Sequence, residues 1–417
     1  MTVERDHAPG KGMVADGLAL SASAAITALA GMIGWVLAAR LLPAAEVGDT
    51  SAFVSGFLLI AGIAELGLGP AVLRWLPRAG SLQPTLLLRT YLVVLAGGVA
   101  GSVVFVLVPA GAEVVHRVPA GVALFLVAGV GWTVFQFQDE VLTGLGLARW
   151  VPVENTAFSV ARLGLLAGLG AVAGGVGLVL SWAVPTMIGV VVVTALIFRA
   201  ARRGAADREP GVLPDRREVV RLLAPSYPAM VCVVVLYNLV PLIVLHRFGA
   251  EANAVFFVVW TAINALDVAA TAFVNPLVVR LSAEPGHARS LVAGAGRRLV
   301  AVFVPLLAVG AVLAWVALAI FGPDYTAGTD LLRILLVAQV PRLVVVLGVA
   351  VHLAAGRGAG VALLHAATAA SAVALALLVP TEFGFGVGML CAQSVLAAFV
   401  LVDLRRRVFP AVVGAPR

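Results

Sequence analysis

The feature that most constrains this sequence is a succession of long apolar stretches that fills almost the whole chain of 417 residues. A helix that crosses a membrane needs about 20 mostly apolar residues. Twelve stretches meet that length: 14–39, 51–73, 87–110, 119–143, 153–173, 176–198, 222–245, 252–279, 299–321, 331–354, 359–380 and 383–404. The sequence therefore predicts an all-α integral membrane protein with about twelve transmembrane helices. The boundary between the fifth and sixth stretches depends only on Gly174, Gly175 and Gly177.

Composition excludes the main soluble classes. Hydrophobic residues make up 62% of the chain and charged residues 12%, whereas a soluble globular domain carries about 25% charged residues. A soluble enzyme, a disordered protein and a disulfide-rich secreted domain are therefore excluded. Cys232 and Cys391 lie inside apolar stretches, so we expect packed thiols with no disulfide and no metal site. We expect no cofactor.

The basic residues predict how the chain is threaded. The chain has a net charge of +7. Its basic residues lie in short gaps between apolar stretches, without interleaved aromatics, so we expect no nucleic-acid partner. With the N-terminus inside, 22 of the 28 basic residues fall on the cytoplasmic side. Only Arg40, Arg117 and Arg247 fall outside, which agrees with the positive-inside rule. The expectation is a multi-pass protein of the inner (plasma) membrane with both termini in the cytoplasm.

Landmarks in the first half of the chain recur in the second half. Arginines after the first, second and fourth stretches reappear 207, 206 and 208 positions later, as the pairs Arg40 and Arg247, Arg74 and Arg280, and Arg149 and Arg357. Six helices per half give both halves the same orientation, which is the parallel repeat of many transporters.

The repeat predicts a division into four segments. An N-terminal six-helix lobe occupies 1–198 and a C-terminal six-helix lobe occupies 222–404. The basic segment 199–221 would form a flexible cytoplasmic linker between them, because it contains Pro210, Gly211 and Pro214. Residues 405–417 would form a cytoplasmic tail.

Several of these landmarks resemble a known family. The sequence reads Ala-Arg40-Leu-Leu-Pro-Ala-Ala-Glu46 after the first stretch, Glu65-Leu-Gly67-Leu-Gly69-Pro in the second, and Phe321-Gly322-Pro323-Asp324-Tyr325 after the ninth. This pattern resembles the polysaccharide-unit flippases of O-antigen type, also called polysaccharide biosynthesis proteins. They belong to the multidrug/oligosaccharidyl-lipid/polysaccharide exporter superfamily, whose other branches include MATE drug antiporters and lipid II flippases.

The resemblance implies a MATE-like carrier with two six-helix lobes around a central cavity. It implies transport by alternating access, in which a saccharide linked to a polyprenyl pyrophosphate moves to the outer leaflet for surface polysaccharide or lipopolysaccharide biosynthesis. The implied partners are that lipid-linked oligosaccharide, membrane lipids, and a polysaccharide polymerase or glycosyltransferase.

The eighth stretch carries polar residues on one helical face. Steps of four, three, four and four residues align Trp260, Asn264, Asp267, Thr271 and Asn275. One interpretation is a cavity wall, in which Trp260 stacks on a sugar ring while Asn264 and Asn275 hydrogen-bond to hydroxyl groups. The other is interhelical hydrogen bonding, which is common in membrane bundles.

Two arginines lie within predicted spans, where a charge is costly. Arg342 could hold pyrophosphate oxygens with its planar fork, or it could neutralise Asp267 on a neighbouring helix. Arg162 could also contact substrate, or it could pair with Asp139, Glu140 or Glu65. Glu65 and Asp267 are alternative coupling residues for a proton, although Glu65 could instead anchor a helix end.

The balance of buried charges leaves a second function open. Glu65 and Asp267 offset Arg162 and Arg342, so a cation-coupled multidrug or metabolite antiporter competes with the flippase. A membrane enzyme is disfavoured because the predicted outside gaps are short and the chain shows no phosphate loop, metal motif or Ser/His/Asp set. We therefore predict a transporter without catalytic residues.

Overall fold

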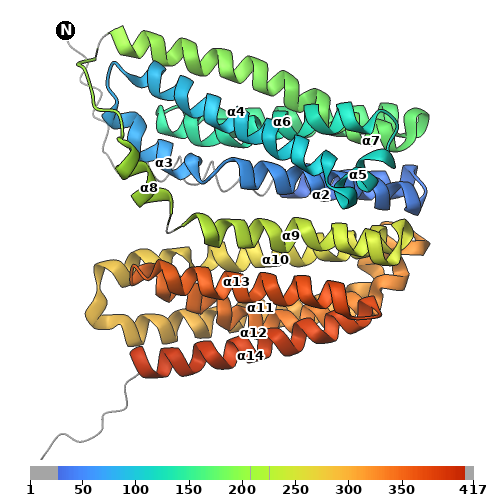
Figure 1. Ribbon diagram of the computed structural model, residues 1–417. Coiled ribbons are helices and arrows are strands. Elements are labelled where there is room, and N and C mark those ends of the chain that lie inside the picture. Colours follow the sequence, from blue (N-terminus) through green and yellow to red (C-terminus); the bar gives the residue numbers. More distant parts are fainter. Residues whose placement is uncertain (1–26, 207, 225, 409–417) are drawn as a thin grey trace, which may run out of the picture. The chain divides into compact units, whose positions relative to one another are not determined.

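The computed structural model describes residues 27–206, 208–224 and 226–408, and these residues are almost entirely helical (Figure 1). Ten of the described helices are long and apolar enough to cross a membrane, and a shorter apolar helix covers Thr27–Leu41. The helix α7 spans 57 residues and contains both predicted stretches 153–173 and 176–198. The prediction of an all-α, multi-pass membrane protein is confirmed.

The described chain divides into two compact units. The first contains residues up to Glu46 and Gly56–Leu223, and the second contains Val47–Ser55 and everything from Ala224 onward. Helices of the first unit are α2 (Ala44–Ala64, whose residues 47–55 cluster with the second unit), α3 (Leu68–Trp75), α4 (Gln83–Leu107), α5 (Pro109–His116), α6 (Gly121–Gly144), α7 (Trp150–Ala206) and α8 (Arg216–Leu223). Those of the second are α9 (Tyr227–Phe248), α10 (Ala250–Ala283), α11 (Ala288–Ala319), α12 (Thr329–Ala354), α13 (Gly358–Leu378) and α14 (Glu382–Arg407).

The second predicted stretch, 51–73, is not one continuous helix. The helix α2 ends at Ala64, and α3 begins at Leu68. Leu66 and Gly67 both have positive φ angles, 54° and 69°, which interrupt the regular hydrogen bonding. The Glu65 carboxylate then accepts a hydrogen bond from the backbone N–H of Gly69 at 3.1 Å. Glu65 therefore caps the start of α3 through backbone contact.

The helix α7 reverses direction at Gly174. This residue has φ 54° and ψ −137°, a conformation outside the helical region. The two arms then lie against each other, because the Glu154 carboxylate of the first arm is 3.7 Å from where a Cβ on Gly189 of the second arm would stand. The glycine run at 174–177 is thus the boundary between two membrane crossings, as the sequence predicts.

The segment predicted as a flexible linker is held by the first unit. Residues 199–206 form the last turns of α7. The next residues run beside the start of α4, where Ser81 N–H donates to the Glu209 carbonyl and Val212 N–H donates to the Arg78 carbonyl, each at 3.0 Å. In α8, Glu218 pairs with Arg78 at 2.9 Å. The proline and glycine residues that suggested flexibility instead form a short extended contact.

The core of the second unit surrounds α12. This helix packs on α10, α11, α13 and α14, while α9 packs on α13 and α10. Most of the buried residues are aliphatic, and the few buried polar ones include Asp267, Gln339 and Arg342. An apolar interior concentrates the energetic effect of these polar groups, because few other partners are available to them.

The reversal at Gly174 gives a testable prediction. Alanine at this position must adopt a left-handed φ, which costs about 1–2 kcal/mol, and its Cβ would lie 2.6 Å from a Glu46 carboxylate oxygen. We expect Gly174→Ala to lower the melting temperature of the detergent-solubilised protein. Gly168→Ala is the matched control, since no atom lies within 4 Å of a Cβ there. Equal melting temperatures for both variants would contradict this account.

Candidate functional site

A buried ion pair joins α10 and α12 in the second unit. The Asp267 carboxylate accepts hydrogen bonds from Arg342 Nε at 3.1 and 3.3 Å and lies 3.1 Å from Nη2. Both side chains are more than nine-tenths buried. A charge in such surroundings requires a partner, and here each residue supplies the other's. Of the two alternatives for Arg342, the structure contains the ion pair.

Two further helices complete the hydrogen bonding of this pair. Arg342 Nη1 donates to the Thr368 hydroxyl of α13 at 3.0 Å, and that hydroxyl donates to the Leu364 carbonyl. The Tyr237 hydroxyl of α9 donates to Asp267. All three nitrogens of the guanidinium are engaged within the unit. A substrate phosphate would therefore compete with Asp267 and Thr368 for Arg342.

A small cavity adjoins the pair. Its volume is about 20 Å³, and its walls include Tyr237, Asp267, Gln339, Arg342 and Gln393, so it has room for about one water molecule. Both polar atoms of the Gln393 side chain, and the indole N–H of Trp260, are buried without a hydrogen-bond partner among the described residues. The cavity is thus lined by unused donors and acceptors next to an ion pair.

The polar face of α10 divides into buried and exposed parts. Trp260 and Asp267 are buried, Asn264 is half-buried, and Thr271 and Asn275 are exposed. The Trp260 ring stacks on Phe256 at 5.6 Å and meets the edge of Phe385 at the same distance. Trp260 therefore packs within an aromatic cluster of the second unit.

Arg162 of α7 has a different environment, in the first unit. Its guanidinium carbon lies 4.0 Å from the ring centroid of Trp182 and 5.8 Å from that of Trp35. The residue is only 5% exposed, and its Nε has no hydrogen-bond partner. Within the part of the chain that the structure describes, no carboxylate pairs with it. The sequence left open an ion pair between Arg162 and a nearby acid. In the structure, Arg162 instead makes cation–π contacts with two tryptophan rings.

Aromatic rings continue around this arginine. Trp182 meets Trp132 at 5.1 Å, Phe57 at 5.8 Å and Phe158 at 6.0 Å between ring centroids. These rings come from α2, α6 and both arms of α7. The sequence did not predict this cluster, because its residues converge only after the reversal at Gly174.

Among the described residues, none of the three acids considered as partners of Arg162 (Asp139, Glu140 and Glu65) forms an ion pair with it. Asp139 accepts a hydrogen bond from the Asn155 side chain at 3.1 Å, and Glu140 lies beside Glu65 near the start of α3. Glu154, which the sequence analysis did not single out, is buried on the first arm of α7. An acid inside the apolar stretch 153–173 was the available signal. Asp16, an acid in the first predicted stretch, lies outside the described residues.

The ion pair gives a second prediction. Asp267→Ala would leave the Arg342 charge buried without its partner, and we expect a loss of about 3–5 kcal/mol in the free energy of unfolding. The double variant Asp267→Leu/Arg342→Met removes both charges at similar volume and should lose less than Asp267→Ala. Chemical denaturation in detergent micelles measures both. An Asp267→Ala variant as stable as the parent would exclude a structural role for the pair.

Comparison with known proteins identifies a family and several proteins of similar fold. Residues 13–281 match the family described as "Polysaccharide biosynthesis protein". No match is found among the curated proteins. The fold is similar to that of the lipid II flippase MurJ in an inward closed conformation, with a TM-score of 0.72 and 11% identity over 92% of this chain and 87% of that one.

Two transporter structures show the same likeness. One is an inward-facing multidrug resistance MATE family transporter of the MOP superfamily, with a TM-score of 0.69 and 16% identity over 92% of this chain and 94% of that one. The other is a MOP superfamily transporter from Pyrococcus furiosus, with a TM-score of 0.58 and 16% identity over 94% of each chain. At these identities the likeness establishes a shared fold.

Proposed function

This chain belongs to the polysaccharide biosynthesis protein family, and we propose that it flips a saccharide linked to a polyprenyl pyrophosphate across the inner membrane by alternating access. Family membership and the MATE and MurJ fold establish a membrane transporter or flippase at the coarse level. The substrate is the finer part of the proposal.

The observation that carries the substrate assignment is the environment of Arg162. A guanidinium buried among tryptophan rings, without a carboxylate partner in the described chain, retains donors for an anionic group. An isolated buried charge destabilises the folded protein. We therefore infer that Arg162 is retained because it binds a ligand. A diphosphate suits this site because guanidinium and phosphate form paired, charge-assisted hydrogen bonds. Arg342, which we expected to bind pyrophosphate as one alternative, is less suited because Asp267 occupies it.

The aromatic cluster supports the saccharide part of the substrate. Trp35, Trp132 and Trp182 present broad apolar surfaces beside the arginine, together with indole N–H donors. Such rings combine an apolar face with a polar edge, which matches a sugar ring whose hydroxyl groups project around an apolar face. In this proposal Asn264 and Asn275 of α10 remain candidates for hydroxyl contacts, because neither is fully buried.

We assign coupling to the pair of Asp267 and Arg342 rather than to Glu65. A proton or cation that binds Asp267 would weaken its hold on Arg342, and the side-chain amide of Gln393, unpartnered among the described residues, lines the adjacent cavity, where it is available to such an ion. Glu65 instead holds the start of α3 through the Gly69 N–H. The affinity of Asp267 for the ion would then differ between two conformations, which is the requirement for coupled transport.

The sidedness of the reaction follows from the distribution of arginines. With 22 of the 28 basic residues on the cytoplasmic side, both termini would lie in the cytoplasm. Substrate would enter from the inner leaflet, where glycosyltransferases assemble it, and would leave for a polymerase at the outer leaflet.

The test is the sidedness of the lipid-linked glycan. Deletion of the gene should accumulate the glycan in the inner leaflet of spheroplasts, and the intact gene should restore the outer-leaflet pool. We expect Arg162→Ala to lower flipping about tenfold or more, the equivalent of losing one or two hydrogen bonds to a charged group. Arg202→Ala, at an exposed position of the same helix, is the matched control and should flip normally.

Two results would contradict the proposal. An unchanged glycan distribution after deletion, in a strain without a second flippase, would refute the substrate class. Full flipping by correctly inserted Arg162→Ala would leave the substrate class intact but remove the role assigned to this residue.

A further inference from the structure

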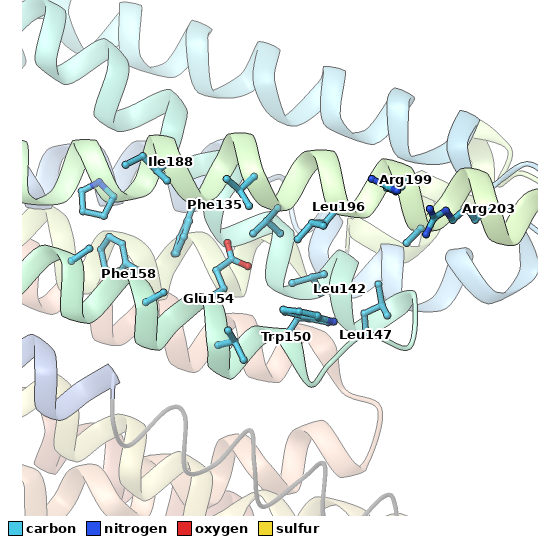
Figure 2. A pocket seen from close by; sticks show the side chains of 18 residues that line it. Phe135, Leu142, Leu147, Trp150, Glu154, Phe158, Ile188, Leu196, Arg199 and Arg203 are labelled. Atoms are coloured by element: carbon cyan, nitrogen blue, oxygen red, sulfur yellow. The ribbon is translucent and has the colours of Figure 1, made fainter.

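A large apolar groove runs along the first unit, and it shares Phe158 with the aromatic cluster that surrounds Arg162, although Arg162 does not line it. It lies between α6 and the two arms of α7, and it encloses about 650 Å³, within the range of about 300–1,000 Å³ for small-molecule sites. Its walls are almost entirely apolar (Figure 2). They include Phe135, Trp150, Phe158, Pro185, Ile188 and Leu196.

The groove contains one buried acidic side chain, that of Glu154. Glu154 lies in the groove wall, with the rings of Phe135 and Phe158 on one side of it in the view and those of Trp150 on the other (Figure 2). It is only 8% exposed, and neither carboxylate oxygen has a hydrogen-bond partner among the described residues. A Cβ on Gly189 of the facing arm would lie 3.0 Å from the Phe135 ring and 3.7 Å from a carboxylate oxygen of Glu154, so this arm approaches the carboxylate closely. The groove therefore contains an acidic group that the protein itself does not satisfy.

The other charged groups near the groove fix the sign of a complementary ligand. Asp139, one helix away, adds a second acidic group that acts electrostatically on Glu154. Arg199 and Arg203 line one end of the groove, where both are exposed and neither forms an ion pair with Glu154. The deep part of the groove is thus acidic and apolar, while the basic groups are solvated at its rim.

We propose that this groove binds a lipophilic organic cation, with Glu154 as its counter-ion. Apolar walls favour a ligand with a large hydrocarbon surface. The desolvated carboxylate favours a positive charge, since a buried charge is stable only when paired. The faces of Phe135, Trp150 and Phe158 add cation–π attraction. This activity goes beyond the proposed flipping of an anionic lipid, because it uses a groove that Arg162 does not line and a residue of opposite charge to Arg162.

A hydrocarbon chain of an anionic lipid is the competing occupant. Such a lipid would place its phosphate at Arg199 and Arg203 and its chain along the same walls. It would leave Glu154 without a partner and would bring a second negative charge into the groove. The two occupants therefore predict opposite dependence on ligand charge.

Two probes of nearly identical shape separate these occupants. Tetraphenylphosphonium carries a positive charge, and tetraphenylborate carries a negative one. We expect the purified full chain in detergent to bind tetraphenylphosphonium with a dissociation constant at least about tenfold lower than that for tetraphenylborate. Titration calorimetry measures both constants.

Variants then locate the binding. Glu154→Gln keeps the shape of the side chain and removes its charge, so we expect tetraphenylphosphonium to bind about tenfold or more weakly. Glu140→Gln is the matched control, since it neutralises a half-buried carboxylate of the same unit that does not line the groove. Ala157→Trp fills the groove and should abolish binding, with folding checked by its melting temperature.

Each contrary result overturns the proposal. Stronger binding of tetraphenylborate, lost in Arg199→Ala/Arg203→Ala, would assign the groove to an anionic lipid. Unchanged binding of tetraphenylphosphonium in Glu154→Gln and Ala157→Trp, or equal weakening in Glu140→Gln, would place the cation elsewhere. None of these outcomes bears on glycan flipping, which is measured separately through Arg162.

Discussion

The cost of placing charge inside an apolar helical bundle governs the interior of both units. In the second unit the cost is met within the protein, because Asp267, Tyr237 and Thr368 converge on Arg342 from three other helices. In the first unit, within the described residues, Arg162 has only aromatic faces and Glu154 has no partner. One unit thus contains a balanced charge cluster, and the other contains two separated charges of opposite sign. Because of this difference, we assign ion coupling to the second unit and ligand binding to the first.

Much of the architecture was predictable from the sequence because hydrocarbon imposes a simple rule on length and polarity. The apolar stretches 252–279 and 359–380 correspond closely to α10 and α13, and the glycines at 174–177 mark a reversal because few other residues adopt that backbone. Predictions failed where local geometry competes with hydropathy. Leu66 takes a left-handed φ inside an apolar stretch, and nothing in hydropathy signals that break. The basic segment after α7 looked flexible by composition, yet backbone pairing with residues 78–81 holds it.

The candidate sites were predictable only in part. Helical spacing placed Asp267 and Trp260 on one face, and the pairing of Asp267 with Arg342 was one of two alternatives that the sequence left open. Choosing between them required the distance between two helices, which no one-dimensional pattern contains. The stacking of Arg162 on Trp182 could not be predicted either, because it also depends on how the two arms of α7 pack. Glu154 was overlooked because a single acid beside Asn155 resembles a solvated helix end, and its burial depends on the facing arm of α7.

The reversal at Gly174 connects two long helical arms without an intervening loop, so the arms share a single register. Each added residue turns an α-helix by about 100°. Inserting one residue into the second arm before Trp182 would therefore rotate both Trp182 away from Arg162 and Gly189 away from Glu154. Two chemically unrelated sites are coupled in this way to the length of one segment. In related sequences, many exposed residues of α7 could therefore change identity without affecting either site. Insertions and deletions between Arg162 and Gly189 would disrupt both sites, so selection would remove them.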